Sequence, residues 1–173
     1  MMNREEILLK SIWVTGKLKL YSEFFQEEVR IDLFTSEKSL RYTDHIISDK
    51  LVQTVNDFLS LPTSEKELMT QLLYKHCLDC CEQISYGVEV KAGETETEAN
   101  LREFGVSTEQ DAFEKAQIDH VVIEEDALRK NRFVRLIFYP EWESEHGCEL
   151  ILKNGKLLNL VGESQTYLAP YDD

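Results

Sequence analysis

Apolar and polar residues alternate within residues 25–34, near the start of the chain, most regularly from Val29 to Leu33. The apolar side of this segment carries Val29, Ile31 and Leu33. A period of two is typical of a half-buried antiparallel strand, because successive side chains of a strand point to opposite faces. Residues 11–21 are rich in β-branched and apolar side chains, and they predict its partner strand. Residues 21–24 are then expected to form the turn of a β-hairpin.

The period changes to that of a helix in the second quarter of the chain. One apolar stripe recurs at helical spacing from Ser48, a favoured N-cap residue, to Pro62, which stops the helix. A second stripe runs to Gly87 and is capped by Thr63 or Ser64, of which Ser64 stands at capping-box spacing from Glu67. Together the two stripes predict an αα-hairpin whose apolar faces pack on the sheet.

The composition changes again after this helix pair. Residues 91–100 read KAGETETEAN and offer almost no large side chain to bury, so we predict an exposed acidic loop over residues 91–107. A short helix is predicted over residues 108–117. Four segments of strand composition follow: 118–124, 133–139, 148–153 and 156–161.

The pair Asn154-Gly155 separates the last two of these segments and predicts a type I′ hairpin turn. Both residues tolerate the positive φ that this turn requires.

The order of elements predicts a single α+β domain over residues 1–173. We expect a mainly antiparallel sheet that combines the N-terminal hairpin with a C-terminal four-strand meander, packed on the αα-hairpin.

Charge narrows the function classes. The chain has 33 Asp and Glu residues against 19 Lys and Arg residues, a net charge of −14. Residues 89–126 alone hold 12 acidic and 3 basic residues, a net charge of −9. This balance argues against nucleic-acid binding, which needs clustered Lys and Arg. No apolar run reaches the roughly 18–20 residues of a membrane span, and no secretory signal is visible, so we expect a cytoplasmic protein.

An acidic surface suits a basic protein partner, because clustered negative potential raises association rates and rejects acidic competitors. A solvated, solubilising loop explains the same charge equally well. For the first interpretation, we assign the partner surface to seven carboxylates and two aromatic anchors: Glu94, Glu96, Glu98, Glu103, Phe104, Glu109, Asp111, Phe113 and Glu114.

A second polar cluster lies between two predicted strands. Glu143, Glu145 and His146 could bind a divalent cation or supply an acid–base pair, with His120 as a further group. This interpretation predicts a metal-dependent hydrolase or a metal-binding protein. The simpler interpretation, which we favour, is a connecting turn whose Trp142 packs back on the sheet.

The third cluster is His76-Cys77-Leu78-Asp79-Cys80-Cys81. Residues four apart share a helix face, so His76 and Cys80 form half of a zinc site, to which Cys148 could add a thiolate. However, no second Cys/His pair stands at ligand spacing, and these cysteines fall in the apolar stripe, so core packing is favoured.

The sequence also lacks a nucleophile elbow, a phosphate-binding loop and a dinucleotide fingerprint. We therefore expect no cofactor and no catalytic residues.

The run Trp142-Glu143-Ser144-Glu145-His146-Gly147, followed by a strand and by Asn154-Gly155-Lys156, resembles small cytosolic bacterial proteins of a domain-of-unknown-function type. The resemblance covers residues 133–161. Proteins of this type often resemble the immunity partners of secreted toxins. It implies a structural turn at Trp142, Glu145, His146 and Gly147, and no active site. We therefore expect a non-enzymatic immunity protein that neutralises a cognate toxin, such as a nuclease, through its acidic surface. A regulatory or scaffold module with another partner is the remaining alternative.

Overall fold

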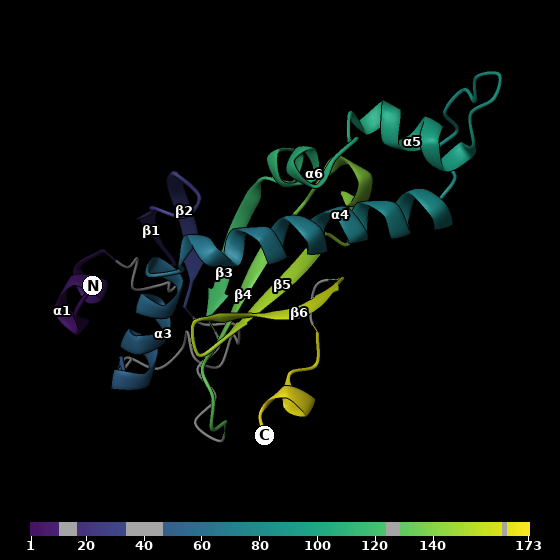
Figure 1. The fold of residues 1–173 in the computed structure, drawn as a ribbon. Helices are drawn as coiled ribbons and strands as arrows, with labels where there is room; N and C mark the ends of the chain where they lie inside the picture. The colour runs from purple at the N-terminus through teal and green to yellow at the C-terminus, as the bar shows by residue number, and fades with distance from the viewer. Residues whose placement is uncertain (11–16, 34–46, 124–128, 164–165) are drawn as a thin grey trace.

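The computed structural model describes residues 1–10, 17–33, 47–123, 129–163 and 166–173. Within these ranges, six strands form one sheet whose spatial order follows the chain order (Figure 1). The strands are β1 (Lys17–Ser22), β2 (Glu27–Asp32), β3 (Ile118–Ile123), β4 (Phe133–Phe138), β5 (Cys148–Lys153) and β6 (Lys156–Gly162). All neighbouring strands pair antiparallel except β2 and β3, which are parallel. The fold is therefore α+β, with the predicted hairpin and four-strand meander.

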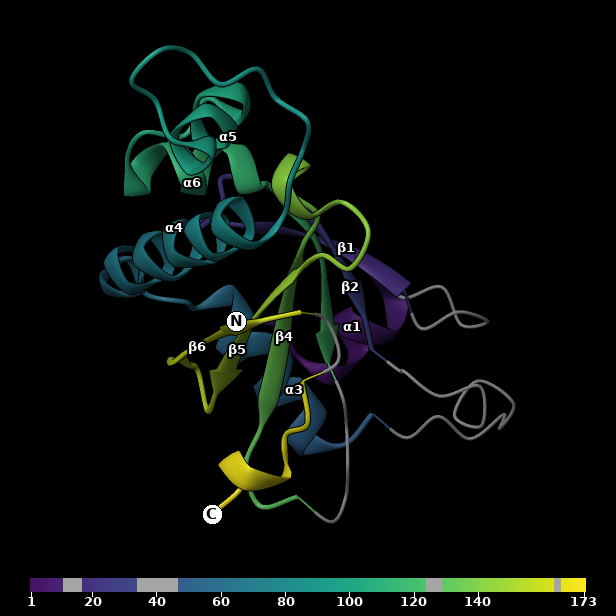
Figure 2. The same ribbon diagram turned by 90° about the vertical axis from the view of Figure 1, so that its right-hand side faces the viewer.

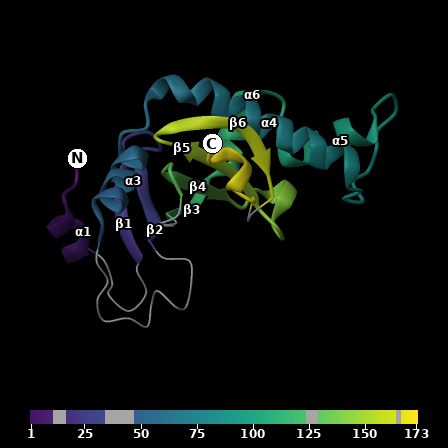
Figure 3. The ribbon, with the colours of Figure 1, turned by 90° about the horizontal axis from the view of Figure 1, so that it is seen from below.

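The helices lie between β2 and β3 in sequence, apart from one at the N-terminus. They are α1 (Arg4–Lys10), α3 (Asp49–Leu59), α4 (Lys66–Gln83), α5 (Glu96–Phe104) and α6 (Glu109–Ala116). Helix α3 packs on β1, β3 and β4, whereas α4 packs on β5 and β6. Figure 2 shows α5 and α6 stacked on α4. Helix α5 projects past the sheet, as the view from below also shows (Figure 3). Among the described residues, no helix combines the length and apolar character needed to cross a membrane.

The N-terminal hairpin is confirmed, but its turn lies two residues later than predicted. Tyr21 and Ser22 continue the ladder opposite Glu28 and Glu27, so the chain reverses only afterwards, where the Gln26 N–H donates to the Ser22 carbonyl at 2.8 Å. The alternation of β2 is confirmed, because its three predicted inward residues are all buried: Val29, Ile31 and Leu33. Residues 11–16 and 34 of the predicted strands lie outside the described ranges.

One of the two predicted helix caps is confirmed. The Ser48 hydroxyl accepts the Leu51 N–H at 3.0 Å at the start of α3. The predicted capping box of Ser64 and Glu67 is wrong, because residues 63–65 form a 3₁₀ turn, η1 (Thr63–Glu65), and α4 begins only at Lys66. Helix α4 also ends before Gly87, since Ile84 already has extended backbone angles.

The exposed acidic loop predicted over residues 91–107 is wrong over most of its length, because residues 96–104 form α5. Thr95 and Glu98 build a capping box at its start, and Gly105 ends it in the left-handed region with φ 65°. The helix is anchored by a polar residue: the Asn100 side chain is fully buried and donates to the carbonyl of Cys81 at 3.0 Å. Sequence patterning missed α5 because the helix buries only Ala99 and Asn100 completely and so carries little hydrophobic signal.

The type I′ turn between β5 and β6 is confirmed by positive φ values of 51° at Asn154 and 80° at Gly155.

The meander supports two apolar clusters on opposite faces. The main core lies between the sheet and the helices and includes Phe58, Leu73 and Leu136. A smaller cluster on the other face holds the C-terminal segment against the sheet: Phe133, Ile151 and Leu168. Full burial of one such side chain contributes roughly 1.5–3 kcal/mol.

Candidate functional site

The predicted partner surface lies on α5, α6 and the residues that precede them, but its carboxylates differ in what they contact. Glu94 accepts two hydrogen bonds from the Arg102 guanidinium, at 2.8 and 3.1 Å, and one from the Lys91 N–H at 3.0 Å. These bonds lower the pKa of Glu94 to about 2. Glu94 therefore links the residues before α5 to Arg102 in the last turn of the same helix.

Two further carboxylates cap the helices. Glu98 accepts the Thr95 N–H at 2.7 Å, and Asp111 accepts the N–H groups of Ser107 and Thr108 at 2.9 and 2.8 Å. Backbone hydrogen bonds to the charged form lower the pKa of both carboxyl groups. Both capping boxes satisfy N–H groups that the first turn of a helix leaves open. Glu98 and Asp111 are therefore engaged in holding the two helices.

The remaining four carboxylates of the predicted surface are exposed: Glu96, Glu103, Glu109 and Glu114. Their only side-chain hydrogen bond among the described residues is the one that Glu114 accepts from Gln110 at 2.8 Å. We call these four residues the acidic surface. They are the part of the predicted site that a partner would meet first.

The two predicted aromatic anchors are half-buried against the domain itself. The Phe104 ring meets Tyr86 edge-on, with centroids 4.9 Å apart. The Phe113 ring lies nearly parallel to Phe25, with centroids 6.5 Å apart, and the Lys66 ammonium stands 4.8 Å from its centroid. Both rings therefore hold α5 and α6 on the body of the domain, and both residues are partly exposed.

The turn that precedes β5 is built around Trp142, which is buried as predicted, with 1% of its surface exposed. It lies in the 3₁₀ turn η2 (Glu141–Glu143). Its indole Nε1–H donates to His76 Nδ1 of α4 at 3.1 Å, and its carbonyl accepts the Tyr86 hydroxyl at 2.7 Å. Gly147 ends the turn with φ +74°. A Cβ at Gly147 would lie 2.8 Å from the Phe138 carbonyl oxygen, so the turn needs glycine there.

The structure does not assemble the predicted metal cluster. Glu143 accepts the backbone N–H of His146 at 3.1 Å and lies 3.3 Å from its Nδ1. Glu145 is exposed, and His120 pairs instead with its neighbour Asp119 at 2.6 Å. Across the described ranges, no three His, Cys, Asp or Glu side chains are grouped so that they could hold a metal ion.

Three of the four cysteines are buried, with 0–2% of their surface exposed: Cys77, Cys81 and Cys148. The interpretation of the α4 cysteines as core residues is therefore confirmed for Cys77 and Cys81. Burial raises the pKa of the Cys148 thiol. Cys80 is the exception, because it is only half-buried.

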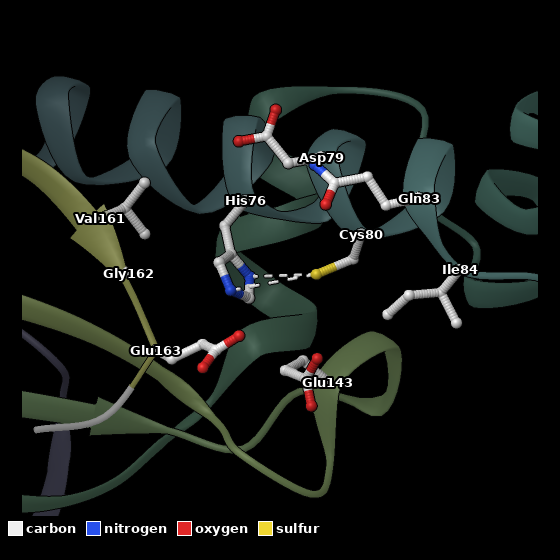
Figure 4. Close-up of a pocket in the computed structure, with 9 residues that line it drawn as sticks. All are labelled: His76, Asp79, Cys80, Gln83, Ile84, Glu143, Val161, Gly162 and Glu163. Carbon is white, nitrogen blue, oxygen red and sulfur yellow. Dashed lines mark hydrogen bonds between the residues drawn. The ribbon is translucent and has the colours of Figure 1, made fainter.

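Cys80 lines a pocket that joins two of the sequence clusters (Figure 4). The pocket has a volume of about 440 Å³. Its lining comes from α4, η2 and the end of β6: His76, Asp79, Cys80, Gln83, Ile84, Glu143, Val161, Gly162 and Glu163. His76 and Glu143 belong to clusters that stand apart in sequence and meet here. Glu163 was not predicted, since nothing in the sequence marks where β6 ends relative to α4.

The model of a domain-of-unknown-function family, DUF6985, matches residues 5–168. The chain belongs to this family. The match reaches well beyond the C-terminal third that carried the sequence resemblance, and it includes all the described strands of the DUF6985 sheet. No curated protein and no solved structure matches the chain.

The proton positions in this DUF6985 pocket follow from the Trp142 hydrogen bond. Because His76 Nδ1 accepts the indole N–H, the proton of the neutral ring sits on Nε2. Burial also lowers the pKa of His76 and so favours the neutral ring. The Cys80 sulfur lies 3.9 and 4.0 Å from the two ring nitrogens, and burial raises the pKa of this thiol to about 12. His76 therefore has no free lone pair to accept the thiol proton, and the pair is not arranged as an activated nucleophile.

Proposed function

We propose that this DUF6985 protein binds a basic protein partner through the acidic surface on α5 and α6. The observation that carries the proposal is the state of its four glutamates. Glu96, Glu103, Glu109 and Glu114 are exposed, and none of them forms an ion pair within the part of the chain that the structure describes.

Unpaired like charges on two adjacent helices repel one another and oppose folding. A partner that carries Lys and Arg at matching positions offsets this repulsion and is attracted from a distance. The three engaged carboxylates keep α5 and α6 in place, so that the four free ones are presented on rigid elements. Phe104 and Phe113 lie on the same two helices and are partly exposed, so they can supply apolar contact area.

In its specific form, the proposal is that the protein acts in the cytoplasm as the immunity protein of a bacterial toxin. The sequence resemblance of the turn at Trp142 to Gly147 supports this form. A toxin with nuclease activity needs a basic groove for the phosphates of its substrate. An acidic surface of the kind seen on α5 and α6 is complementary to such a groove and blocks it.

Charge-matched variants of the full chain test the proposal. The first variant changes Glu96, Glu103, Glu109 and Glu114 to Gln and leaves the three engaged carboxylates intact. The control makes the same net-charge change at four exposed glutamates on other elements: Glu5, Glu27, Glu28 and Glu67. The partner is isolated with the wild-type protein as bait, purified, and assayed for binding at low and high salt.

We expect the first variant to lose affinity and salt dependence, while the control keeps both. Equal binding by the two variants contradicts the acidic surface as the binding site. For the specific form, the purified partner must also be toxic or nucleolytic, and the wild-type protein must inhibit it at equimolar ratio. A partner without such activity contradicts the immunity role and leaves a regulatory or scaffold module.

A further inference from the structure

The pocket beside His76 has the size and position of a ligand site. Its volume of about 440 Å³ falls within the roughly 300–1,000 Å³ that is typical of small-molecule pockets. It opens where α4, η2 and the end of β6 meet, which are three separate elements of the fold. Figure 4 shows the His76 ring directed into the space between Glu143 and Glu163.

The lining carries negative charge that the domain neutralises only in part. Three carboxylates border the pocket: Asp79, Glu143 and Glu163. Asp79 pairs with Lys75, and Glu143 accepts the His146 N–H. Glu163 has no hydrogen bond or ion pair with any described residue, and none of the described lining residues is a lysine or arginine. A cation in the pocket would therefore find two carboxylates without a lysine or arginine partner.

His76 adds an independent observation. The residue is buried, with 7% of its surface exposed. With Nδ1 occupied by Trp142, its Nε2–H makes one contact with an acceptor among the described residues, the Cys80 sulfur at 4.0 Å. A sulfur at this distance is a weak acceptor, so the Nε2–H can still donate a hydrogen bond toward the pocket. An oxygen atom of a ligand would satisfy it.

The proton on Nε2 of His76 also bears on whether the ligand is a metal ion or an organic cation. A metal ion needs the lone pair of a ring nitrogen, but in His76 one nitrogen accepts the indole N–H and the other carries the proton. A guanidinium or ammonium group needs only carboxylate acceptors. The lining therefore favours an organic cation over a metal.

We infer that this pocket binds an organic cation, a guanidinium or ammonium group, between Glu143 and Glu163, with a neighbouring oxygen that accepts the Nε2–H of His76. The group belongs either to a free small molecule or to a basic side chain of a protein partner. The site is separate from the acidic surface and is tested without a partner.

A titration of the full-length protein tests this site. The probe is N-acetylargininamide, which carries a guanidinium group and amide oxygens, and its neutral match is N-acetylcitrullinamide. Ethanolamine represents a free small amine. Binding is followed by the indole N–H resonance of Trp142, which reports on His76, and by calorimetry. We expect saturable binding of the charged probe in the millimolar range and none of the neutral match.

Three variants locate the binding. Glu163→Gln removes the unpaired carboxylate from an exposed position, and it should weaken binding roughly three- to tenfold, as for loss of one charge-assisted contact. Glu145→Gln changes an exposed residue that shares the turn of Glu143 but does not line the pocket. This variant should bind the probe as the wild type does. The quadruple acidic-surface variant should also bind as the wild type, which separates this site from the proposed function.

Binding of ethanolamine as well as the arginine probe assigns the pocket to free amines. Binding of the arginine probe alone assigns it to a basic side chain. If neither the arginine probe nor ethanolamine binds saturably, the proposal is overturned. Binding of the neutral match as tight as that of the arginine probe overturns it as well. Binding that Glu163→Gln leaves unchanged overturns it too.

Discussion

The indole Nε1–H of Trp142 donates to Nδ1 of His76 at 3.1 Å, across 66 positions of the sequence. Both side chains are buried, and they come from the turn before β5 and from the middle of α4. This bond links α4 to the turn before β5, sets the tautomer of His76 and thereby sets the chemistry of the pocket.

Removal of that donor should destabilise the domain. In Trp142→Phe, His76 Nδ1 becomes a buried acceptor without a donor, and the smaller ring leaves a cavity. We expect a loss of about 2–4 kcal/mol in the free energy of unfolding, measured by urea denaturation. Tyr167→Phe, at a residue that is 74% exposed, is the control and should lie within about 0.5 kcal/mol of the wild type. A neutral effect of Trp142→Phe would show that the bond is not structural.

Two glycine substitutions should separate backbone strain from collision. Gly147 and Gly93 both have positive φ, at +74° and +85°. A Cβ at Gly93 meets nothing within 4 Å, whereas one at Gly147 lies 2.8 Å from the Phe138 carbonyl oxygen. We expect Gly93→Ala to cost about 1–2 kcal/mol from strain alone, and Gly147→Ala to cost clearly more. Thermal unfolding of the two variants gives the comparison, and equal costs would contradict the close contact.

The buried ion pair on the face of the sheet that the C-terminal segment covers gives a third prediction. Arg135 of β4 donates to both carboxylate oxygens of Glu149 on β5, at 2.9 and 3.0 Å, and to the carbonyl of Thr166 at 2.9 Å. Glu149→Leu leaves the guanidinium buried without its carboxylate and should cost about 3–5 kcal/mol.

The double variant Arg135→Met/Glu149→Leu removes both charges and should recover part of that loss. Chemical denaturation of both proteins measures the recovery. A double variant less stable than Glu149→Leu would show that the guanidinium stabilises the fold through Thr166 rather than through the pair.

The ion pair of Glu94 should make stability depend on acid pH. The folded pKa is lowered from 4.5 to about 2 by Arg102 and by the Lys91 N–H, so the stabilisation is present above pH 4.5 and is lost as the pH falls towards 2. The wild type should therefore be more stable than Glu94→Gln at pH 7, and the difference should shrink below pH 4.5. Thermal unfolding across this range tests it, with Glu96→Gln, which removes no ion pair, as the control. A constant difference contradicts the prediction.

Local patterns predicted the elements whose information lies within a few residues. The alternation in β2, the Ser48 cap and the Asn154-Gly155 turn are all present in the structure. Helix α5 was missed because its anchor, Asn100, bonds to carbonyls on α4 and just after it. A polar anchor contributes no hydrophobic periodicity, so only the capping pair Thr95 and Glu98 marked the helix.

The site shows the same division. The charge of the segment around α5 and α6 is visible in composition, but which glutamates are free depends on where the helices begin. Glu98 and Asp111 become caps, and Glu94 becomes the partner of Arg102, only once each helix has formed. Sequence spacing alone treats all seven carboxylates as equivalent.

The sequence by itself determined the α+β class, the strand meander and the acidic excess, because periodicity, turn residues and charge act locally. Only the tertiary structure decided that α4 lies against the end of β6 and the turn at Trp142, and so brought His76, Glu143 and Glu163 to one pocket. That meeting depends on packing between segments far apart in the chain. A one-dimensional pattern carries no information about such distances.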